Sequence, residues 1–214
     1  MEKTEDNVIT IEQPNTNEEP KNEEKNNYDH INKEFNTSKI QLSSNADSKK
    51  KITLKVTFGA INRNNYNQLK QLNNMTLPVR YLSGFYYRII HNMRLGRFAY
   101  YNDIIVGAIT WKYDKYLDET KNEQRNVYLM TISVLDEYRR YGIGSKLLEE
   151  IIKIHKKLKE VTYITLHVQS SNVVALKFYE KHGFEKYKFL ENYYTGPEVN
   201  PKDAYYLRYK IRND

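Results

Sequence analysis

The chain has 214 residues, with 34 basic and 27 acidic side chains, a formal net charge of +7 and no cysteine. The lack of cysteine excludes disulfide bonds, thiolate metal sites and a cysteine nucleophile. No stretch approaches the roughly 18 apolar residues that cross a bilayer, and the N-terminus lacks the apolar core of a signal peptide. We therefore expect a protein of the cytoplasm or the nucleus without membrane partners.

The composition changes near residue 50. Residues 1–50 hold 11 acidic and 7 basic residues, many Asn, Ser and Thr, and few apolar side chains. Such a segment buries too little apolar surface to offset its ordering entropy, so we predict a disordered tail over 1–50 and one folded domain over 51–214. The domain holds 27 basic and 16 acidic residues. This surplus favours a polyanionic neighbour such as nucleic acid, a ribosome surface or a phosphate-bearing cofactor, and equally fits solvated lysines on helix faces.

Hydrophobic periodicity and turn residues predict the elements in chain order. They are a strand over 52–58, a helix around 66–72 that stops before Pro78, a helix over 84–94, a hairpin of strands over 98–101 and 104–113 turning at Asn102-Asp103, a polar link over 114–125 and a strand over 127–134. A helix from Ser145, a strand over 163–168, a helix over 173–182 and strands over 185–192 and 204–211 follow. Asn172 is a candidate N-cap and Gly183 a candidate C′ residue of the last helix. This order predicts an α+β fold with helices on both faces of the sheet.

The segment 139–144 reads Arg-Arg-Tyr-Gly-Ile-Gly and joins the strand over 127–134 to the helix from Ser145. Its two glycines allow backbone N–H groups to turn inward, the helix N-terminus attracts anions, and Arg139 adds a cation. The spacing R-x-x-G-x-G differs from the dinucleotide fingerprint G-x-G-x-x-G, and no Gly-Lys-Ser/Thr follows as in a P-loop. The segment therefore predicts a pyrophosphate-binding loop of another kind.

A second motif, N-x-x-A-x-x-F-Y-E-K-x-G-F, runs from Asn172 to Phe184. With the loop and the element order, it resembles the Gcn5-related N-acetyltransferase (GNAT) superfamily over residues 52–211. The resemblance implies a central mixed, mostly antiparallel sheet that splays between its fourth and fifth strands, acetyl-CoA as the acetyl donor, and no metal. The cofactor-binding residues that it implies are Ile132, Ser133, Val134, Arg139, Arg140, Tyr141, Gly142, Ile143, Gly144, Ser145, Asn172, Ala175, Phe178, Tyr179 and Lys181.

Four further segments resemble the N-terminal acetyltransferases of the NatE catalytic subunit (San) type: residues 77–81, 128–131, 166–169 and 192–194. The resemblance implies nascent polypeptide N-termini as substrates, Met-starting with an apolar or small second residue. It also implies NatA auxiliary and catalytic subunits and the ribosome as partners, without sequence-specific nucleic-acid binding. The implied substrate-binding residues are Leu77, Pro78, Val79, Tyr81, Met130, Tyr193, Tyr194, Thr195 and Gly196. Leu77 stands where the family typically has Phe, and the loop after Tyr194 is longer than usual, so we expect a reshaped pocket for the first substrate residue.

The chemistry requires a base, because an α-amine with a pKa near 8 is largely protonated at neutral pH and cannot then attack a thioester. His167, with an ordinary pKa near 6.5, suits this role, and the resemblance pairs it with Tyr128 through an ordered water. A lone strand histidine is also often a core residue, and Tyr128 is one of 20 tyrosines. A backbone N–H near Ile132 is the expected oxyanion donor. Without cysteine, direct attack in a ternary complex is expected.

Two other functions stay open. A lysine ε-acetyltransferase would need a stronger base, since its substrate amine has a pKa near 10.4, and the predicted fourth and fifth strands offer no carboxylate. A non-catalytic scaffold that binds acetyl-CoA or the ribosome would need neither Tyr128 nor His167. Among the remaining residues, we expect Trp111 in the core, His91, His155 and His182 on helix surfaces or ends, and Lys153, Lys156, Lys157 and Lys159 on a solvated helix face.

Overall fold

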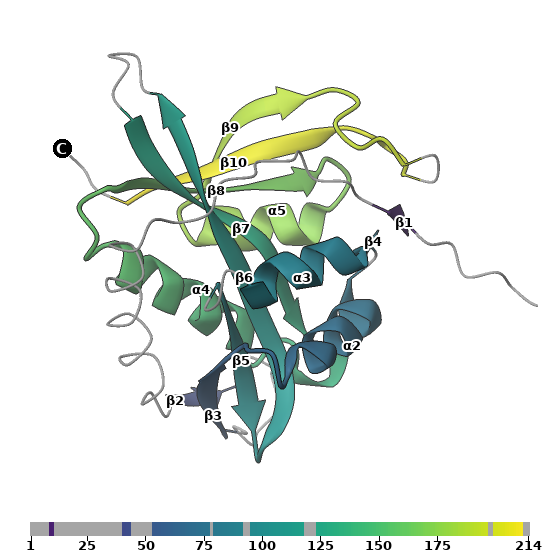
Figure 1. Cartoon of the computed structure of the whole chain (residues 1–214), viewed down its shortest axis with the longest axis vertical. Helices are drawn as coiled ribbons and strands as arrows, with labels where there is room; N and C mark the ends of the chain where they lie inside the picture. The colour runs from purple at the N-terminus through teal and green to yellow at the C-terminus, as the bar shows by residue number, and fades with distance from the viewer. Residues whose placement is uncertain are drawn as a thin grey trace, which may run out of the picture.

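The computed structural model describes residues 9–10, 40–43, 53–77, 79–91, 95–117, 123–196 and 199–211. Eight of the described strands form one sheet in the order β2-β3-β5-β6-β7-β8-β10-β9 (Figure 1). Their bounds are β2 Ile40–Ser43, β3 Thr53–Ala60, β5 Gly96–Tyr101, β6 Ile104–Leu117, β7 Glu123–Val134, β8 Val161–Gln169, β9 Glu185–Leu190 and β10 Ala204–Lys210. A separate parallel pair joins β1 (Ile9–Thr10) to β4 (Val79–Arg80). Within 1–50 only β1 and β2 are described, so the disorder of this segment stays a prediction.

In the part of the chain that the structure describes, four α-helices cover the two faces of the sheet (Figure 1). They are α2 Tyr66–Thr76, α3 Ser83–His91, α4 Ile143–His155 and α5 Val173–Lys181. Adjacent strand residues point to opposite faces, so Phe98 joins the cluster under α2 and α3 while Ala99 joins the larger cluster under α4 and α5. This confirms the predicted α+β class with helices on both faces. None of the described helices is long and apolar enough to cross a membrane.

The stripe of apolar residues on α4 shows why this helix forms where the sequence predicts it. Leu147, Leu148 and Ile151 are fully buried in the larger cluster, and each such side chain contributes about 1.5–3 kcal/mol of burial free energy. The helix begins at Ile143 rather than at Ser145, because Gly142 adopts a left-handed N-cap conformation with φ 86°. Of the other turn signals, Asn102 and Asp103 both have positive φ, as the predicted hairpin turn requires.

The hairpin of β6 and β7 is longer than the sequence indicates. Asp114 pairs with Asn126 and Leu117 with Glu123, so the predicted polar link over 114–125 is wrong at both ends. In this part of the hairpin, contacts between side chains of the two strands stabilise the pairing. The Arg125 guanidinium, for example, lies 5.6 Å from the centre of the Tyr113 ring. Such polar–aromatic contacts stabilise paired strands without an apolar pattern that the sequence could reveal.

The centre of the sheet opens between β7 and β8. These strands are parallel and pair only from Arg125 to Tyr128, whose partner is Thr165. Beyond this point β7 continues to Val134 beside β6, and β8 continues to Gln169 beside β10. The predicted splay between the fourth and fifth strands is thus confirmed. A bulge in β7 lies at the same level: Thr131 pairs with Thr110 and Leu129 with Trp111, so Met130 bulges between them.

Candidate active site

Tyr128 and His167 meet where β7 and β8 separate. Tyr128 is the last residue of the parallel pairing, and its partner Thr165 lies two residues before His167 on the same face of β8. The Tyr128 hydroxyl oxygen is 3.0 Å from His167 Nδ1. The imidazole also stacks on Tyr193, with ring centroids 4.2 Å apart and planes 13° apart. These contacts fix the orientation of the imidazole at the edge of the opening.

A cavity of about 270 Å³ adjoins the Tyr128–His167 pair. Its walls are Lys112, Asp114, Tyr128, His167, Leu190, Tyr193 and Tyr206. The ammonium of Lys112 lies 2.9 Å from the Asp114 carboxylate and 5.1 Å from the centre of the Tyr128 ring. Four of these residues were not predicted from the sequence: Lys112, Asp114, Leu190 and Tyr206. The available signal was the alternation of Lys112 with Asp114 on one strand; Tyr206 depends on the register of β10, which places it opposite His167.

The electrostatics of this site keep both members of the pair neutral at pH 7. Burial, and then the charge of Lys112, lower the pKa of His167 from 6.5 to about 4. Burial, and then the nearby Tyr193, raise the pKa of the Tyr128 phenol well above its ordinary value. A neutral imidazole therefore faces a protonated phenol, so one of the two groups donates and the other accepts across the 3.0 Å contact.

The loop between β7 and α4 presents unpaired amides at a helix N-terminus. Arg140 and Gly142 adopt positive φ values of 68° and 86°. The first bond at the start of α4 runs from Lys146 N to Gly142 O, so the amides of Ile143, Gly144 and Ser145 have no acceptor within this helix. Amides in this position bind anions, with the partial charge of the helix dipole behind them. The Ile143 side chain is buried, so only its backbone can face a ligand.

The second motif packs directly against this loop. A Cβ on Gly144 would lie 3.7 Å from the Phe178 ring, which brings α5 beside the N-terminus of α4. Asn172 caps α5 as predicted, since its side chain accepts from Ala175 N at 3.0 Å. Tyr179 is buried in the core, where burial and the nearby Tyr81 raise its pKa. Lys181, in contrast, is exposed in the last turn of α5, at the end of the helix away from Asn172.

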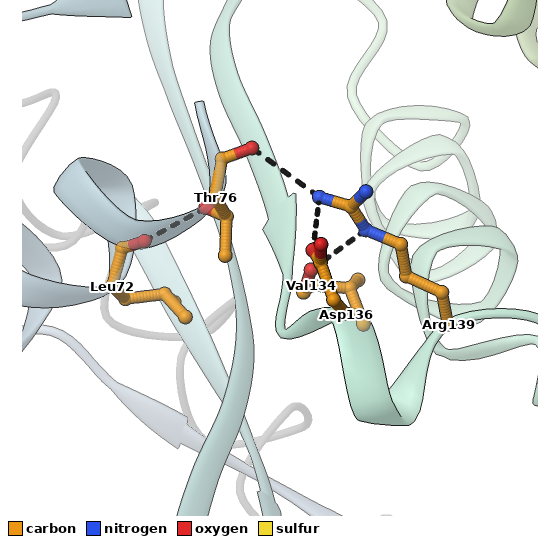
Figure 2. A network of polar contacts seen from close by, with 5 residues as sticks. All are labelled: Leu72, Thr76, Val134, Asp136 and Arg139. Carbon is orange, nitrogen blue, oxygen red and sulfur yellow. Dashed lines mark hydrogen bonds and ion pairs between the residues drawn. The ribbon is translucent and has the colours of Figure 1, made fainter. Parts of the chain in front are cut away.

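Arg139 makes contacts that its motif does not predict. Its Nε donates to Val134 O at 3.1 Å and its Nη2 to Thr76 O at 3.3 Å, and Nη2 also lies 2.7 Å from the Asp136 carboxylate (Figure 2). Asp136 belongs to a short 3-10 helix, Asp136–Tyr138. The guanidinium therefore joins the end of β7 to the end of α2, whereas the sequence predicts a cation for the cofactor loop.

The residues expected to contact the substrate gather around the β7 bulge. The Tyr81 hydroxyl donates to Met130 O at 3.4 Å, and the Tyr81 ring stacks on Phe85. Burial and then the nearby Tyr194 raise the pKa of Tyr81, and Tyr194 packs edge-on against Tyr193.

The other expected substrate residues lie at the ends of two neighbouring segments. Leu77 is the half-buried C-cap of α2. Thr195 is exposed and Gly196 half-buried in the loop after Tyr194. Pro78 and the side chain of Val79 lie outside the described residues.

One prediction about the histidines is wrong, because His155 is fully buried. Its Nδ1 donates to Ile151 O at 2.8 Å, so the neutral ring accepts the Tyr113 hydroxyl at Nε2, 2.9 Å away. Trp111 and Tyr113 of β6 pack against the imidazole in the last turn of α4. Trp111, 6.1 Å from His155 between ring centres, is buried as predicted.

Two further histidines were predicted on helix surfaces or ends. Of these, His182 is half-buried at the end of α5, where its Nδ1 lies 2.7 Å from Phe178 O. The side chain of His91 lies outside the described part of the chain. Lys153, Lys156, Lys157 and Lys159 are exposed, as predicted. Only Lys153 lies on the helix, however, because α4 ends at His155 and the other three lysines follow it. Among the described residues, no three His, Asp or Glu side chains are grouped as a metal site requires.

Comparison with known protein families shows to which family the chain belongs. The family model described as acetyltransferase (GNAT) family matches residues 66–184. The chain belongs to the acetyltransferase (GNAT) family. Its open β7–β8 pair and its loop of unpaired amides fit acetyl-CoA, the acetyl donor of this family: the amides of Ile143 to Ser145 would hold the pyrophosphate, and the gap between the strands would admit the thioester arm.

Individual relatives cover most of this acetyltransferase. The chain is 39% identical over 157 residues to a probable N-acetyltransferase san of Drosophila melanogaster, covering 73% of this chain and 82% of the relative. It is 38% identical over 159 residues to N-alpha-acetyltransferase 50 of Danio rerio, covering 74% and 90%. Among solved structures, Arabidopsis thaliana Naa50 in complex with the bisubstrate analogue CoA-Ac-MVNAL is 38% identical, with a TM-score of 0.62 and coverage of 72% and 97%.

Proposed function

We propose that this acetyltransferase transfers the acetyl group of acetyl-CoA to the α-amine of polypeptide N-termini that begin with Met followed by an apolar or small residue. The observation that carries the proposal is the Tyr128–His167 contact of 3.0 Å at the point where β7 and β8 separate. The surrounding tyrosines, Tyr81, Tyr193 and Tyr194, form an aromatic border suited to a peptide end. Two relatives that are N-acetyltransferases by name, and an Arabidopsis Naa50 complex whose analogue carries the peptide MVNAL, support this substrate class.

The Tyr128–His167 pair can accept the proton that the substrate nitrogen must lose during the reaction. An α-amine has a pKa near 8, so about a tenth of it is neutral at pH 7. As its nitrogen bonds to the acetyl carbon, the nitrogen becomes acidic and must lose a proton. We propose that the Tyr128 phenol donates to His167 Nδ1 in the resting site. Transfer of the substrate proton to the phenol oxygen, with transfer of the phenol proton to Nδ1, then leaves a neutral tyrosine and an imidazolium.

The role of acetyl-CoA in this scheme is to supply the activated acetyl group, and the protein supplies position and proton removal. The unpaired amides at the N-terminus of α4 hold the phosphates. The low pKa of His167 keeps the imidazole unprotonated before the reaction. The chain contains no cysteine, so the amine attacks the thioester carbon directly in a ternary complex. The C–S bond breaks as the amide bond forms, and the sulfur leaves as the thiolate of CoA, which takes up a proton from solvent.

The proposal also covers where the acceptor N-termini come from and where in the cell they are acetylated. We propose nascent chains as the source of the N-termini, with docking on NatA auxiliary and catalytic subunits at the ribosome, in the cytoplasm. The basic surplus of residues 51–214 is the property of this chain that supports a polyanionic neighbour. Co-sedimentation of the full chain with ribosomes at low and high salt measures this association; binding that salt leaves unchanged would contradict an electrostatic contact.

Release of free CoA tests the reaction itself. We expect the purified protein to release CoA when it is given acetyl-CoA and a short Met-Leu peptide, and to release little with the same peptide blocked at its N-terminus. The blocked peptide is the matched control, because it keeps every side chain and removes only the amine. A panel of free N-termini that yields no CoA release would remove the proposal in favour of a scaffold role.

A further inference from the structure

The guanidinium of Arg139 connects the cofactor loop to the helix that precedes the expected substrate segment. Figure 2 shows its two donors reaching backbone carbonyls of separate elements, Val134 at the end of β7 and Thr76 at the end of α2. Val134 is the last residue of β7, and Thr76 is the last residue of α2, directly before residues 77–81. A planar fork with several N–H donors suits such a bridge, and a lysine could not make both bonds in the same geometry.

A buried hydrogen bond ties the same two elements together one turn away. The Ser133 hydroxyl donates to Asn73 Oδ1 at 3.1 Å, and both residues are buried. Asn73 O in turn accepts the Leu77 amide at 2.9 Å, which closes α2 immediately before the substrate segment. The last turn of α2 thus rests on β7 through Asn73 inside the protein and through Thr76 at the surface.

The surface contact is the adjustable one. The Arg139 side chain is 48% exposed, and its backbone directly precedes Arg140, which is held at φ 68°. A ligand on the amides of Ile143 to Ser145 restricts the backbone of this loop, and with it the starting point of the Arg139 side chain. The Thr76 carbonyl lies in the last turn of α2, where the helix dipole favours a cation. A ligand that holds the loop in the conformation seen here therefore keeps the Arg139 side chain where it reaches Thr76 O.

We propose that Arg139 is a positioning residue that couples occupancy of the cofactor loop to the end of α2, so that acetyl-CoA and the peptide N-terminus bind cooperatively. The inference rests on the proposed function only for the role of residues 77–81 in contacting the peptide. Cooperative binding is reciprocal, so the cofactor strengthens peptide binding by the same factor by which the peptide strengthens cofactor binding. A coupled site also lowers the chance that the peptide occupies the enzyme before the donor is present.

Hydrogen exchange tests the coupling without any peptide. In the wild-type protein, saturating CoA should slow exchange of the amides of Ile143 to Ser145, which reports binding, and also of the Leu77 amide, which reports the end of α2. In Arg139→Lys at saturating CoA, the loop amides should still be slowed and the Leu77 amide should not. Arg88→Lys, on the exposed face of α3, is the matched control and should behave as wild type.

A second readout measures the coupling factor directly. We expect CoA to tighten binding of a Met-Leu peptide to the wild-type protein by about five-fold or more, and by less than two-fold in Arg139→Lys. Asp136→Asn, which removes the charge 2.7 Å from Arg139, should give an intermediate factor and guards against a folding defect in the first variant. The proposal is overturned if CoA protects the loop amides but leaves Leu77 unchanged in wild type, or if Arg139→Lys keeps the full factor. Protection of Leu77 in a protein that acetylates no peptide would support the coupling and refute the proposed function.

Discussion

His167 lies face to face with Tyr193, with ring centroids 4.2 Å apart and planes 13° apart. Tyr193 comes from the loop after β9, and the imidazole also contacts Tyr206 of β10, 4.8 Å away between ring centres. The imidazole thus packs against two aromatic rings while its Nδ1 meets the Tyr128 hydroxyl. The loop that borders the peptide site therefore also orients the proposed base.

The stacking contact predicts different outcomes for two substitutions of Tyr193. Tyr193→Ala should lower kcat/KM by about 2- to 10-fold through the lost stacking alone, since aromatic pairs contribute about 0.5–1.5 kcal/mol. Tyr193→Phe keeps the ring and should retain most of the activity with a Met-Leu peptide. Equal losses in the two variants would show that the hydroxyl, and not the stacked ring, is what matters.

Removal of either member of the proton-transfer pair should abolish most of the turnover. A positioned general base contributes about 10²–10⁴ in rate, so Tyr128→Phe and His167→Ala should each lower kcat at least about 100-fold. The double variant should lose little more than the single variants, because the two residues act as one unit. Calorimetric titration with CoA is the control, and its affinity should stay near the wild-type value. Unchanged kcat in both single variants would contradict the role of this pair in proton transfer.

The pH dependence of the reaction follows from the low pKa of His167. With a pKa of about 4, His167 is already unprotonated at pH 6, so kcat/KM should rise with the substrate amine, with a midpoint near pH 8, and show no inflection near 6.5. Lys112→Gln removes a charge that lowers the pKa of His167. The pKa should then rise, and activity should begin to fall at a higher pH as the solution is acidified. Lys112→Arg keeps the charge and should keep the wild-type profile.

Buried His155 predicts how folding stability depends on pH. Burial lowers the pKa of His155 from 6.5 to about 4, so between these values the unfolded chain binds a proton that the folded protein does not. The free energy of unfolding should therefore fall as the pH falls from about 6.5 to about 4, and should be independent of this group above pH 7. His167 acts in the same direction.

Urea titrations at several pH values measure this effect. His155→Leu should flatten the slope between pH 6.5 and 4, at a cost at pH 7 of about 1–3 kcal/mol for the Tyr113 hydroxyl, which loses its bond to the histidine. Tyr113→Phe, which removes one partner of His155 and leaves the histidine, is the matched control and should keep the slope. A wild-type slope in His155→Leu would mean that other groups cause the acid sensitivity.

Local patterns were sufficient for most of the fold. Apolar periodicity marked β7 and α4, and cap residues such as Asn172 marked the ends of helices, because these signals act within a few residues. The end of β6 was not predictable, since Asp114 and Leu117 pair in a ladder held by contacts between strands. His155 follows Ile151 by four residues and therefore lies on the buried stripe of α4, where its ring contacts Trp111 and Tyr113 of β6.

The candidate site was predictable only as far as its motifs extend. The motifs named Tyr128 and His167, and their contact follows once β7 and β8 are placed in register. The bond between Arg139 and Thr76 joins residues that are 63 positions apart in the chain. The local sequence indicates other roles for both: Arg139 as a cation of the cofactor loop, and Thr76 as part of the helix before Pro78. Tyr206 similarly reaches His167 through the register of β10 against β8, which no local pattern reveals.

The position of the acetyl group on a product peptide tests the central proposal most directly. A peptide that begins Met-Leu and carries one internal lysine, incubated with the protein and acetyl-CoA and then fragmented in a mass spectrometer, should carry the acetyl group on its N-terminal amine. Acetylation of the lysine side chain, with the α-amine left free, would contradict the account.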